Sequence, residues 1–360
     1  MTIDQLPTPS VLIDVDALGR NIRAMQEACD RGGVKLWPHI KTHKCVEILR
    51  MQLQAGATGI TCAKIGEAEA MLPSGVRNVF LAHSLVDPAL IPRLRTLAGK
   101  LDRLILAVTS QPHAEHLDRL LTSAGLAFPV FVAMDTGLGR EGARSLTAFA
   151  DIVRFASASR SLDPVGVYCH EGHTYRSAAV EDIDRLTVEV HEKISAAAGI
   201  LPPGSEVAPG CSVSASRLAA MPGVTMVRPG AYPLGDLNLA HRLPLMAWSD
   251  CAATLLATVV DRPDAGLAIL DAGSKSFSGD KDAQGQSALA LRNREIAVSG
   301  VNEEHGYVRG PQADALRIGD RLRFVPAHVC TMMNMADEVY AVSGDTVLDT
   351  WKIQGRGKVH

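Results

Sequence analysis

Lys41 lies between two histidines in the segment W-P-H-I-K-T-H-K at residues 37–44. The segment begins in an apolar, strand-like run at residues 36–40 and leads into a helical pattern at residues 43–55. Cations are disfavoured at a helix N-terminus by the helix dipole, so a cluster of basic side chains there needs another explanation. A lysine held rigidly among other cations can present a neutral amine that attacks an aldehyde and forms a Schiff base. Spacing alone leaves open an ordinary solvated lysine at a helix start.

Two glycine-containing turns resemble cradles for an anion. They are G-C-S-V-S at residues 210–214 and R-P-G-A-Y at residues 228–232. Backbone N–H groups and hydroxyls that follow the last two strands of a parallel barrel commonly hold a phosphate. The pattern is equally that of two ordinary loops between strand and helix.

His328 and Cys330 flank Val329 after a strand-like run at residues 321–325. In an extended segment both side chains would point to one face, and nitrogen and thiolate sulfur are ligands that Zn²⁺ prefers. Taken alone, the pattern favours a buried cysteine beside a structural histidine. A zinc ion bound by this pair would need water or substrate to complete its shell.

The elements that would position these residues alternate between strand and helix. Strand-like runs lie at residues 36–40, 59–63, 79–82, 104–108, 130–134, 165–169, 206–209 and 225–228. Helical patterns lie at residues 43–55, 87–99, 112–124, 145–158 and 181–198. Eight such units predict an α/β fold, a (β/α)8 TIM-type barrel over residues 15–243.

Polar and glycine-rich residues follow the predicted strands. They include His39 and Lys41, Lys64, and the stretches 135–140, 170–175, 210–214 and 228–232. Barrel enzymes gather their catalytic groups at the carboxyl ends of the strands, so we expect these residues to share one rim.

The rest of the chain has a different pattern. Strand-like runs separated by Gly, Pro and Asp turns occur at residues 253–260, 267–271, 321–325, 338–342 and 346–353. We expect residues 244–360 to form a C-terminal, mostly β domain that carries the His328–Cys330 pair. Residues 1–14 include an extra strand, Ser10–Asp14, which we expect to join that domain.

Composition excludes several classes of function. The net charge of −3 gives no reason to expect a nucleic-acid or anionic-membrane partner, and no apolar run approaches a membrane span. The first seven residues lack the features of a signal peptide, so we expect a cytoplasmic location. The seven cysteines are scattered and odd in number, which is not a disulfide framework. Glycine motifs for dinucleotides or a P-loop are missing.

A set of motifs in a fixed order adds a resemblance. The motifs are P-H-I-K-T-H-K, C-A-K-I-G-E-A-E, D-T-G-L-G-R, H-E-G-H-T-Y, R-P-G-A-Y, L-D-A-G-S-K, E-E-H-G and H-V-C-T-M-M-N. From residue 8 to the C-terminus, the chain resembles the D-serine dehydratase and D-threonine aldolase family of fold-type III pyridoxal-phosphate enzymes. That family is related to the N-terminal domain of alanine racemase.

The resemblance implies a homodimer with its active site near the interface, and a divalent metal beside the cofactor. It also implies roles for individual residues. Lys41 would carry pyridoxal phosphate, Arg140 would lie near its ring, and His170 and Tyr175 would line its pocket. The phosphate would be held by Gly210, Ser212, Gly230 and Tyr232, and the metal by His328 and Cys330.

The H-x-C pattern bears on the reaction. Family members with H-x-C resemble zinc-dependent dehydratases, and those with H-x-D resemble aldolases that use Mn²⁺ or Mg²⁺, as ligand softness suggests. We therefore expect dehydration of a D-3-hydroxy amino acid to a keto acid and ammonia. An aldolase that gives glycine and an aldehyde is the nearest alternative. A racemase and a non-catalytic cofactor-binding protein are more distant ones.

The chain departs from the family pattern at three positions. Trp37 stands where the family often has Arg, Ala231 where it often has Asn, and Cys211 interrupts the usual Gly-Ser-Thr-Pro turn. We expect these differences to change individual phosphate contacts, and they are compatible with a different substrate.

Overall fold

The computed structural model describes residues 1–177 and 179–360, and the chain divides into two compact units. The β unit comprises Met1–Arg23, Thr42–Ile48 and Ala231–Gly357. The barrel unit comprises Ala24–Lys41, Leu49–Gly230 and Lys358–His360. The two units are defined by the contacts within each of them. The domain limits predicted from the sequence, at residues 14 and 243, instead mark where the barrel pattern begins and ends along the chain. Those limits stay a prediction.

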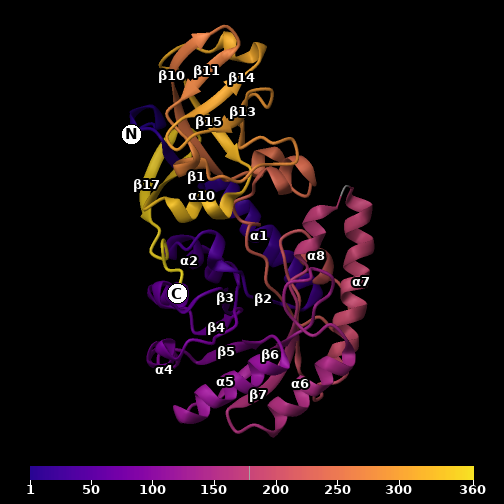
Figure 1. Ribbon diagram of the computed structural model, residues 1–360. Coiled ribbons are helices and arrows are strands. Elements are labelled where there is room, and N and C mark those ends of the chain that lie inside the picture. Colours follow the sequence, from indigo (N-terminus) through magenta and orange to yellow (C-terminus); the bar gives the residue numbers. More distant parts are fainter. Residues whose placement is uncertain (178) are drawn as a thin grey trace. The chain divides into compact units, whose positions relative to one another are not determined.

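Eight parallel strands form the barrel unit (Figure 1). They are β2 (Lys35–Leu36), β3 (Ile60–Cys62), β4 (Asn78–Leu81), β5 (Arg103–Val108), β6 (Phe128–Ala133), β7 (Leu162–Tyr168), β8 (Glu206–Ala208) and β9 (Met226–Val227). The strands β3 to β8 make one sheet, and β2 pairs with β9. The Thr61 amide donates to the Pro38 carbonyl and the Thr225 amide to the Val207 carbonyl, which joins the pair to both sheet edges. The predicted barrel is confirmed.

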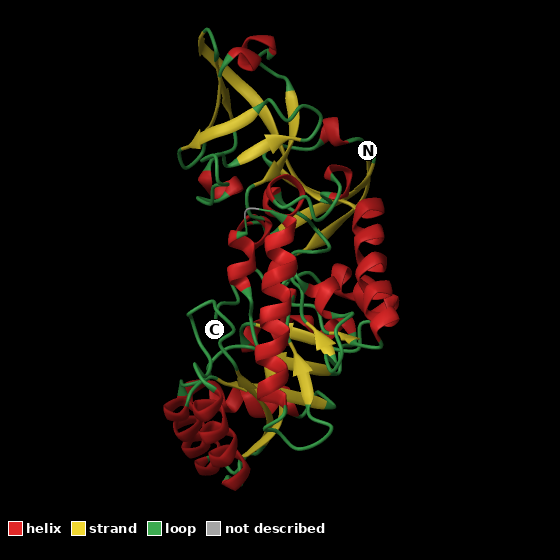
Figure 2. Ribbon diagram, turned by 90° about the vertical axis from the view of Figure 1, so that its right-hand side faces the viewer, coloured by secondary structure: helices red, strands yellow, loops and turns green. Residues whose placement is uncertain are grey.

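Helices follow the strands as the periodicity predicts. They are α2 (Val46–Ala55), α3 (Ile65–Met71), α4 (Ile91–Ala98), α5 (Gln111–Ser123), α6 (Leu146–Ala158), α7 (Val180–Ala198) and the short α8 (Ala215–Leu218), while α1 (Val15–Gly32) precedes β2. Side-chain caps start three of them, because Asp14, Ser110 and Ser145 accept the amides of Ala17, His113 and Ala148. Figure 2 shows the helices of this unit in red beside its strands in yellow.

The barrel interior is a packed core. Its buried side chains are Trp37, Phe80, Ile105, Ala107, Phe131, Ala133, Tyr168, Ala208 and Met226. The ring of Phe80 lies 4.9 Å from that of Phe131 and 5.0 Å from that of Tyr168, between ring centroids. A core filled in this way has no room for a ligand between the strands, which leaves the rim for chemistry.

The β unit contains a nine-stranded sheet. Its strands lie in the order β11 (Leu267–Leu270), β14 (Gly306–Arg309), β13 (Ala297–Val301), β12 (Ala288–Ala290), β15 (Arg321–Pro326), β10 (Ala253–Asp264), β1 (Ser10–Asp14), β16 (Glu338–Ser343) and β17 (Thr346–Lys352). An additional pairing of β10 with β11 closes the first six strands into a small barrel. The strand β1 lies between β10 and β16, so the prediction that Ser10–Asp14 joins the β domain is confirmed.

Two short helices, α9 (Ser274–Phe277) and α10 (Val329–Met335), accompany the sheet. The sequence did not predict β12, β13 and β14, which are three to five residues long. Among the residues that the structure describes, no helix is both long and apolar enough to cross a membrane.

Candidate active site

Lys41 lies on the rim of the barrel unit, in the 3-10 turn η2 (Ile40–Thr42) that follows β2. The position is half-buried. The amide of Lys41 contacts Nδ1 of His39 at 3.4 Å, and the His39 amide donates to the Pro229 carbonyl at 2.9 Å. The segment before Gly230 is therefore fastened beside the lysine.

Two histidines lie within electrostatic reach of Lys41. Burial, followed by the positive charge of Lys41, lowers the pKa of His39 well below its usual value. The same two causes, in the same order, lower the pKa of His170 to about 4. Both imidazoles are therefore neutral at pH 7, and each can accept a hydrogen bond.

Arg140 belongs to the loop that follows β6. Its guanidinium is exposed and pairs with Glu141 at 2.8 Å, and its charge also lowers the pKa values of His39 and His170. The loop is held by Asp135, whose Oδ1 accepts the amides of Gly137 and Gly139 at 3.1 Å. Arg140 therefore faces the same rim as Lys41.

The next loop carries His170 and, in the 3-10 turn η5 (Gly172–Arg176), the half-buried Tyr175. A methyl group added to Gly172 would lie 2.9 Å from Nε2 of His170. Nδ1 of His170 lies 3.3 Å from the carbonyl oxygen of Gly210. The loops after β7 and β8 are thus in direct contact.

The glycine loop after β8 approaches β9 closely. A Cβ on Gly210 would lie 2.4 Å from the backbone nitrogen of Arg228, so only glycine fits there. The Ser212 hydroxyl accepts the Gly230 amide at 3.2 Å, which links the two turns expected to form the anion cradle.

Seven of the ten predicted site residues belong to the barrel unit. They are Lys41, Arg140, His170, Tyr175, Gly210, Ser212 and Gly230. Tyr232, which is buried, and the pair His328 and Cys330 belong to the β unit.

The His328–Cys330 pair is not in an extended segment, and that expectation was wrong. His328 is the N-cap residue of α10, and Cys330 lies in the first turn of that helix. The two side chains nevertheless lie close together, since interaction with Cys330 is the main cause that raises the pKa of His328 to about 9. The side chain of an N-cap residue with extended backbone lies over the first turn of its helix. His328 and Cys330 are therefore neighbours, as expected, although they are not part of a strand.

Other polar groups of the β unit surround this pair. The Thr42 hydroxyl lies 3.1 Å from the Cys330 sulfur. Asp236, which is buried, accepts the Val329 amide at 3.3 Å through Oδ2, and its charge also raises the pKa of His328. Across the described residues, no group of three or more His, Cys, Asp or Glu side chains is placed to hold a metal. A metal on this pair would take its remaining ligands from water or substrate.

Two buried charged residues at the rim were not singled out from the sequence. The Arg228 guanidinium lies 5.4 Å from the ring centroid of Phe80 and 5.2 Å from that of Tyr168. Glu171 is fully buried between the loops after β7 and β8. Both lie in quoted motifs, but no sequence signal distinguishes a buried charge from a solvated one.

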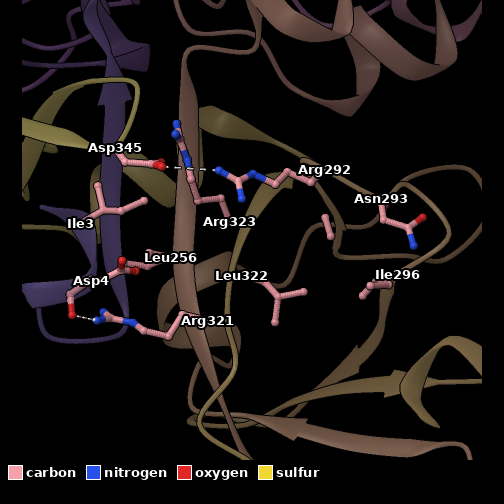
Figure 3. A pocket seen from close by; sticks show the side chains of 11 residues that line it. Ile3, Asp4, Leu256, Arg292, Asn293, Ile296, Arg321, Leu322, Arg323 and Asp345 are labelled. Carbon is pink, nitrogen blue, oxygen red and sulfur yellow. Dashed lines mark hydrogen bonds and ion pairs between the residues drawn. The ribbon is translucent and has the colours of Figure 1, made fainter. Parts of the chain in front are cut away.

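A separate cavity of about 290 Å³ opens in the β unit beside β10 and β15 (Figure 3). Arg321 donates to the backbone carbonyls of Asp4 and Leu6, while Arg292 pairs with Asp345 at 3.5 Å. These arginines fasten the N-terminal turn and the loops around the sheet. None of the predicted site residues is among the described residues that line this cavity.

Similarity to known proteins extends over nearly the whole chain. Residues 13–238 match the family described as alanine racemase, N-terminal domain, and residues 252–342 match the putative serine dehydratase domain. The chain is 32% identical to D-threo-3-hydroxyaspartate dehydratase of Delftia sp. strain HT23, covering 98% of each chain. It is 30% identical to D-threonine aldolase of Arthrobacter sp., covering 98% of this chain and 93% of the aldolase.

A solved structure is similarly close. It is the metal-free form of a cysteine-to-alanine variant of D-threo-3-hydroxyaspartate dehydratase, with a TM-score of 0.89 and 29% identity over 98% of each chain.

Proposed function

Because the chain belongs to the D-serine dehydratase and D-threonine aldolase family, we propose that it is a pyridoxal-phosphate- and zinc-dependent lyase. It removes water from a D-3-hydroxy amino acid such as D-serine or D-threo-3-hydroxyaspartate, and the enamine that is released takes up water again and hydrolyses to a keto acid and ammonia. The observation that carries this proposal is the convergence of Lys41, His170 and the Gly210 loop on one rim of the barrel.

The rim residues fit pyridoxal phosphate. Lys41 offers an amine beside two neutral histidines, and the linked turns at Ser212 and Gly230 are suited to hold a phosphate. When bound, the cofactor acts as an electron sink that acidifies the α-carbon of an amino acid. Lys41 is positioned to take the α-proton, while Arg140 and Tyr175 help to orient the ring.

His328 and Cys330 fit a zinc ion, because an imidazole nitrogen and a thiolate sulfur form a donor set that zinc favours over Mn²⁺ or Mg²⁺. Bound there, the ion would act as a Lewis acid toward the β-hydroxyl and make it a better leaving group. The Asp236 carboxylate accepts a hydrogen bond from the Val329 amide and so holds the segment that carries the pair. Tyr232 completes our proposed phosphate contacts.

Aldol cleavage is the second candidate, because the chain is almost as similar to D-threonine aldolase as to the dehydratase. A metal at the same pair would then lower the pKa of the hydroxyl, and a base would remove the hydroxyl proton. Cys330 favours the dehydratase, since family members that resemble the aldolases carry H-x-D in place of H-x-C.

Product analysis separates the two reactions. The cofactor- and metal-replete protein is incubated with D-serine, D-threonine and D-threo-3-hydroxyaspartate, and the products are identified by mass. We expect a keto acid and ammonia in equal amounts. Glycine with an aldehyde would replace this proposal by the aldolase. A chelator should abolish activity, and Zn²⁺ should restore it better than Mn²⁺.

We also propose a homodimer and a cytoplasmic location. Sedimentation equilibrium of the loaded protein tests the first, and fractionation of cells that express the full chain tests the second.

A further inference from the structure

Glu171 is a fully buried carboxylate in the barrel unit, directly after His170. Its Oε2 accepts the Gly210 amide at 3.1 Å, and its Oε1 accepts the Ser214 hydroxyl at 2.7 Å. The two acceptors therefore hold both ends of the loop at residues 210–214. The middle of that loop contains Ser212, which contacts Gly230.

The backbone of the same residue strengthens this junction. The Thr174 hydroxyl donates to the Glu171 carbonyl at 2.7 Å and also lies 3.3 Å from the Cys211 sulfur. The Cys211 sulfur lies 3.4 Å from the Ser214 hydroxyl. The turn after β7 and the loop after β8 form one buried polar network that rests on Glu171.

A buried carboxylate is stabilised by a positive charge, and Arg228 is one that interacts electrostatically with Glu171. The guanidinium, also buried, donates to the carbonyls of Ala208 at 2.9 Å and Cys169 at 2.5 Å. Burial lowers the pKa of Arg228, and Glu171 is among the groups whose negative charge opposes that effect. The two charges thus stabilise each other in a place with little water.

We propose that Glu171 is a positioning residue that presets the loop at residues 210–214 for the phosphate of the cofactor. The inference rests on the proposed function, since it takes this loop as the phosphate cradle. Glu171 does not contact the phosphate in this account. It occupies the Gly210 amide and the Ser214 hydroxyl, and so fixes the direction in which Ser212 and the Gly230 turn face.

The substitution Glu171→Ala removes both acceptors, whereas Glu171→Gln can keep both contacts. The glutamine oxygen would accept the Gly210 amide, and its NH2 group would donate to the Ser214 hydroxyl, which can also accept. The matched control is Glu206→Gln. Glu206 is likewise buried but begins β8, at the other end of the strand, where it pairs with Lys35 and Arg103 at 2.7 Å.

The measurement is the dissociation constant of cofactor-free, full-length protein for pyridoxal phosphate and for pyridoxal, which lacks the phosphate. We expect Glu171→Ala to weaken pyridoxal phosphate at least about tenfold, as the loss of one buried hydrogen bond would, and to leave pyridoxal within about threefold. Glu171→Gln should bind pyridoxal phosphate within about threefold of the natural chain. Glu206→Gln should lower stability without changing either constant.

Unchanged binding of pyridoxal phosphate by Glu171→Ala would overturn the inference, and so would an equal loss for both ligands. The inference would also be overturned if Glu171→Gln bound pyridoxal phosphate as weakly as Glu171→Ala does, because the hydrogen bonds that glutamine keeps would then have no effect on the phosphate site. If Glu171→Ala fails to fold, Ser214→Ala replaces it, with a loss confined to pyridoxal phosphate expected. If the natural chain binds neither ligand, the proposed function itself fails.

Discussion

Lys41 is the residue around which the site is arranged, and its charge acts on its neighbours. His39 and His170 are held neutral by burial and by Lys41, whereas His328 in the β unit is held protonated by Cys330. One residue type therefore serves two purposes in the same chain. Neutral imidazoles suit proton transfer beside the lysine, and the third lies beside a cysteine with which it could hold a metal after losing its proton.

The lowered pKa of His170 makes a prediction about stability. The unfolded chain binds a proton at His170 below about pH 6.5, whereas the folded chain does so only near pH 4. Stability is therefore complete above pH 6.5 and falls as the pH drops from 6.5 to 4, by about 3 kcal/mol from this residue.

Urea unfolding of the cofactor-free protein at pH 7 and pH 4.5 measures this dependence. We expect His170→Gln to lose clearly less stability over the interval than the natural chain does. His305→Gln, at an exposed position of the β unit, is the control and should behave like the natural chain. An unchanged dependence in His170→Gln would show that the residue is not held neutral.

Residue roles were only partly predictable from the sequence. Lys41 was found because a cation at the predicted start of a helix is unusual and because its motif belongs to an ordered set of eight. Glu171 lies in an equally specific motif, H-E-G-H-T-Y, yet nothing in its type shows that it is buried. Its role depends on the loop at residues 210–214, which is about 40 residues away in the chain.

At the scale of elements, the apolar runs predicted the barrel strands well, since buried parallel strands are nearly continuous hydrophobic stretches. The strands β12 to β14 were missed because three to five residues are too few to show an alternation of apolar and polar side chains. The helix α10 was missed for a related reason. A cap followed by two turns of helix cannot be told from a strand continuation in H-V-C-T-M-M-N.

A second prediction concerns Arg228, the residue that follows strand β9, and the stability of the protein without it. Arg228→Met would leave the carbonyls of Ala208 and Cys169 without their donor and Glu171 without its compensating charge. We expect a loss of about 3 kcal/mol in the free energy of unfolding. Arg77→Met is the control, because the Arg77–Asp102 pair is exposed to solvent and should contribute little to stability. Equal losses in the two variants would contradict the account.

At the scale of the whole molecule, the chain builds the sheet of the β unit from two distant segments. The strand β1 pairs with β10 on one side and β16 on the other. The sequence predicted this membership, because a spare strand before α1 has no place in a barrel of eight strands. Its central position in the sheet was not predictable, since strand order depends on contacts more than 200 residues apart.

A chain that starts at residue 15 tests this arrangement. It would expose two unpaired edges in the middle of the nine-stranded sheet. We expect that protein to aggregate or to lose its β unit to limited proteolysis, and a synthetic peptide of residues 1–14 to restore protection. A shortened chain that resists proteolysis as the full chain does would show that β1 is dispensable.

The claim on which the proposed function depends most directly is that Lys41 carries the cofactor. The pyridoxal-phosphate-loaded protein is reduced with borohydride and digested, and the phosphopyridoxyl group is located by tandem mass spectrometry. We expect the group on Lys41, with the nearby Lys44 and Lys64 unmodified as internal controls. Label on either of those lysines instead, or no label in the loaded protein, would contradict the account.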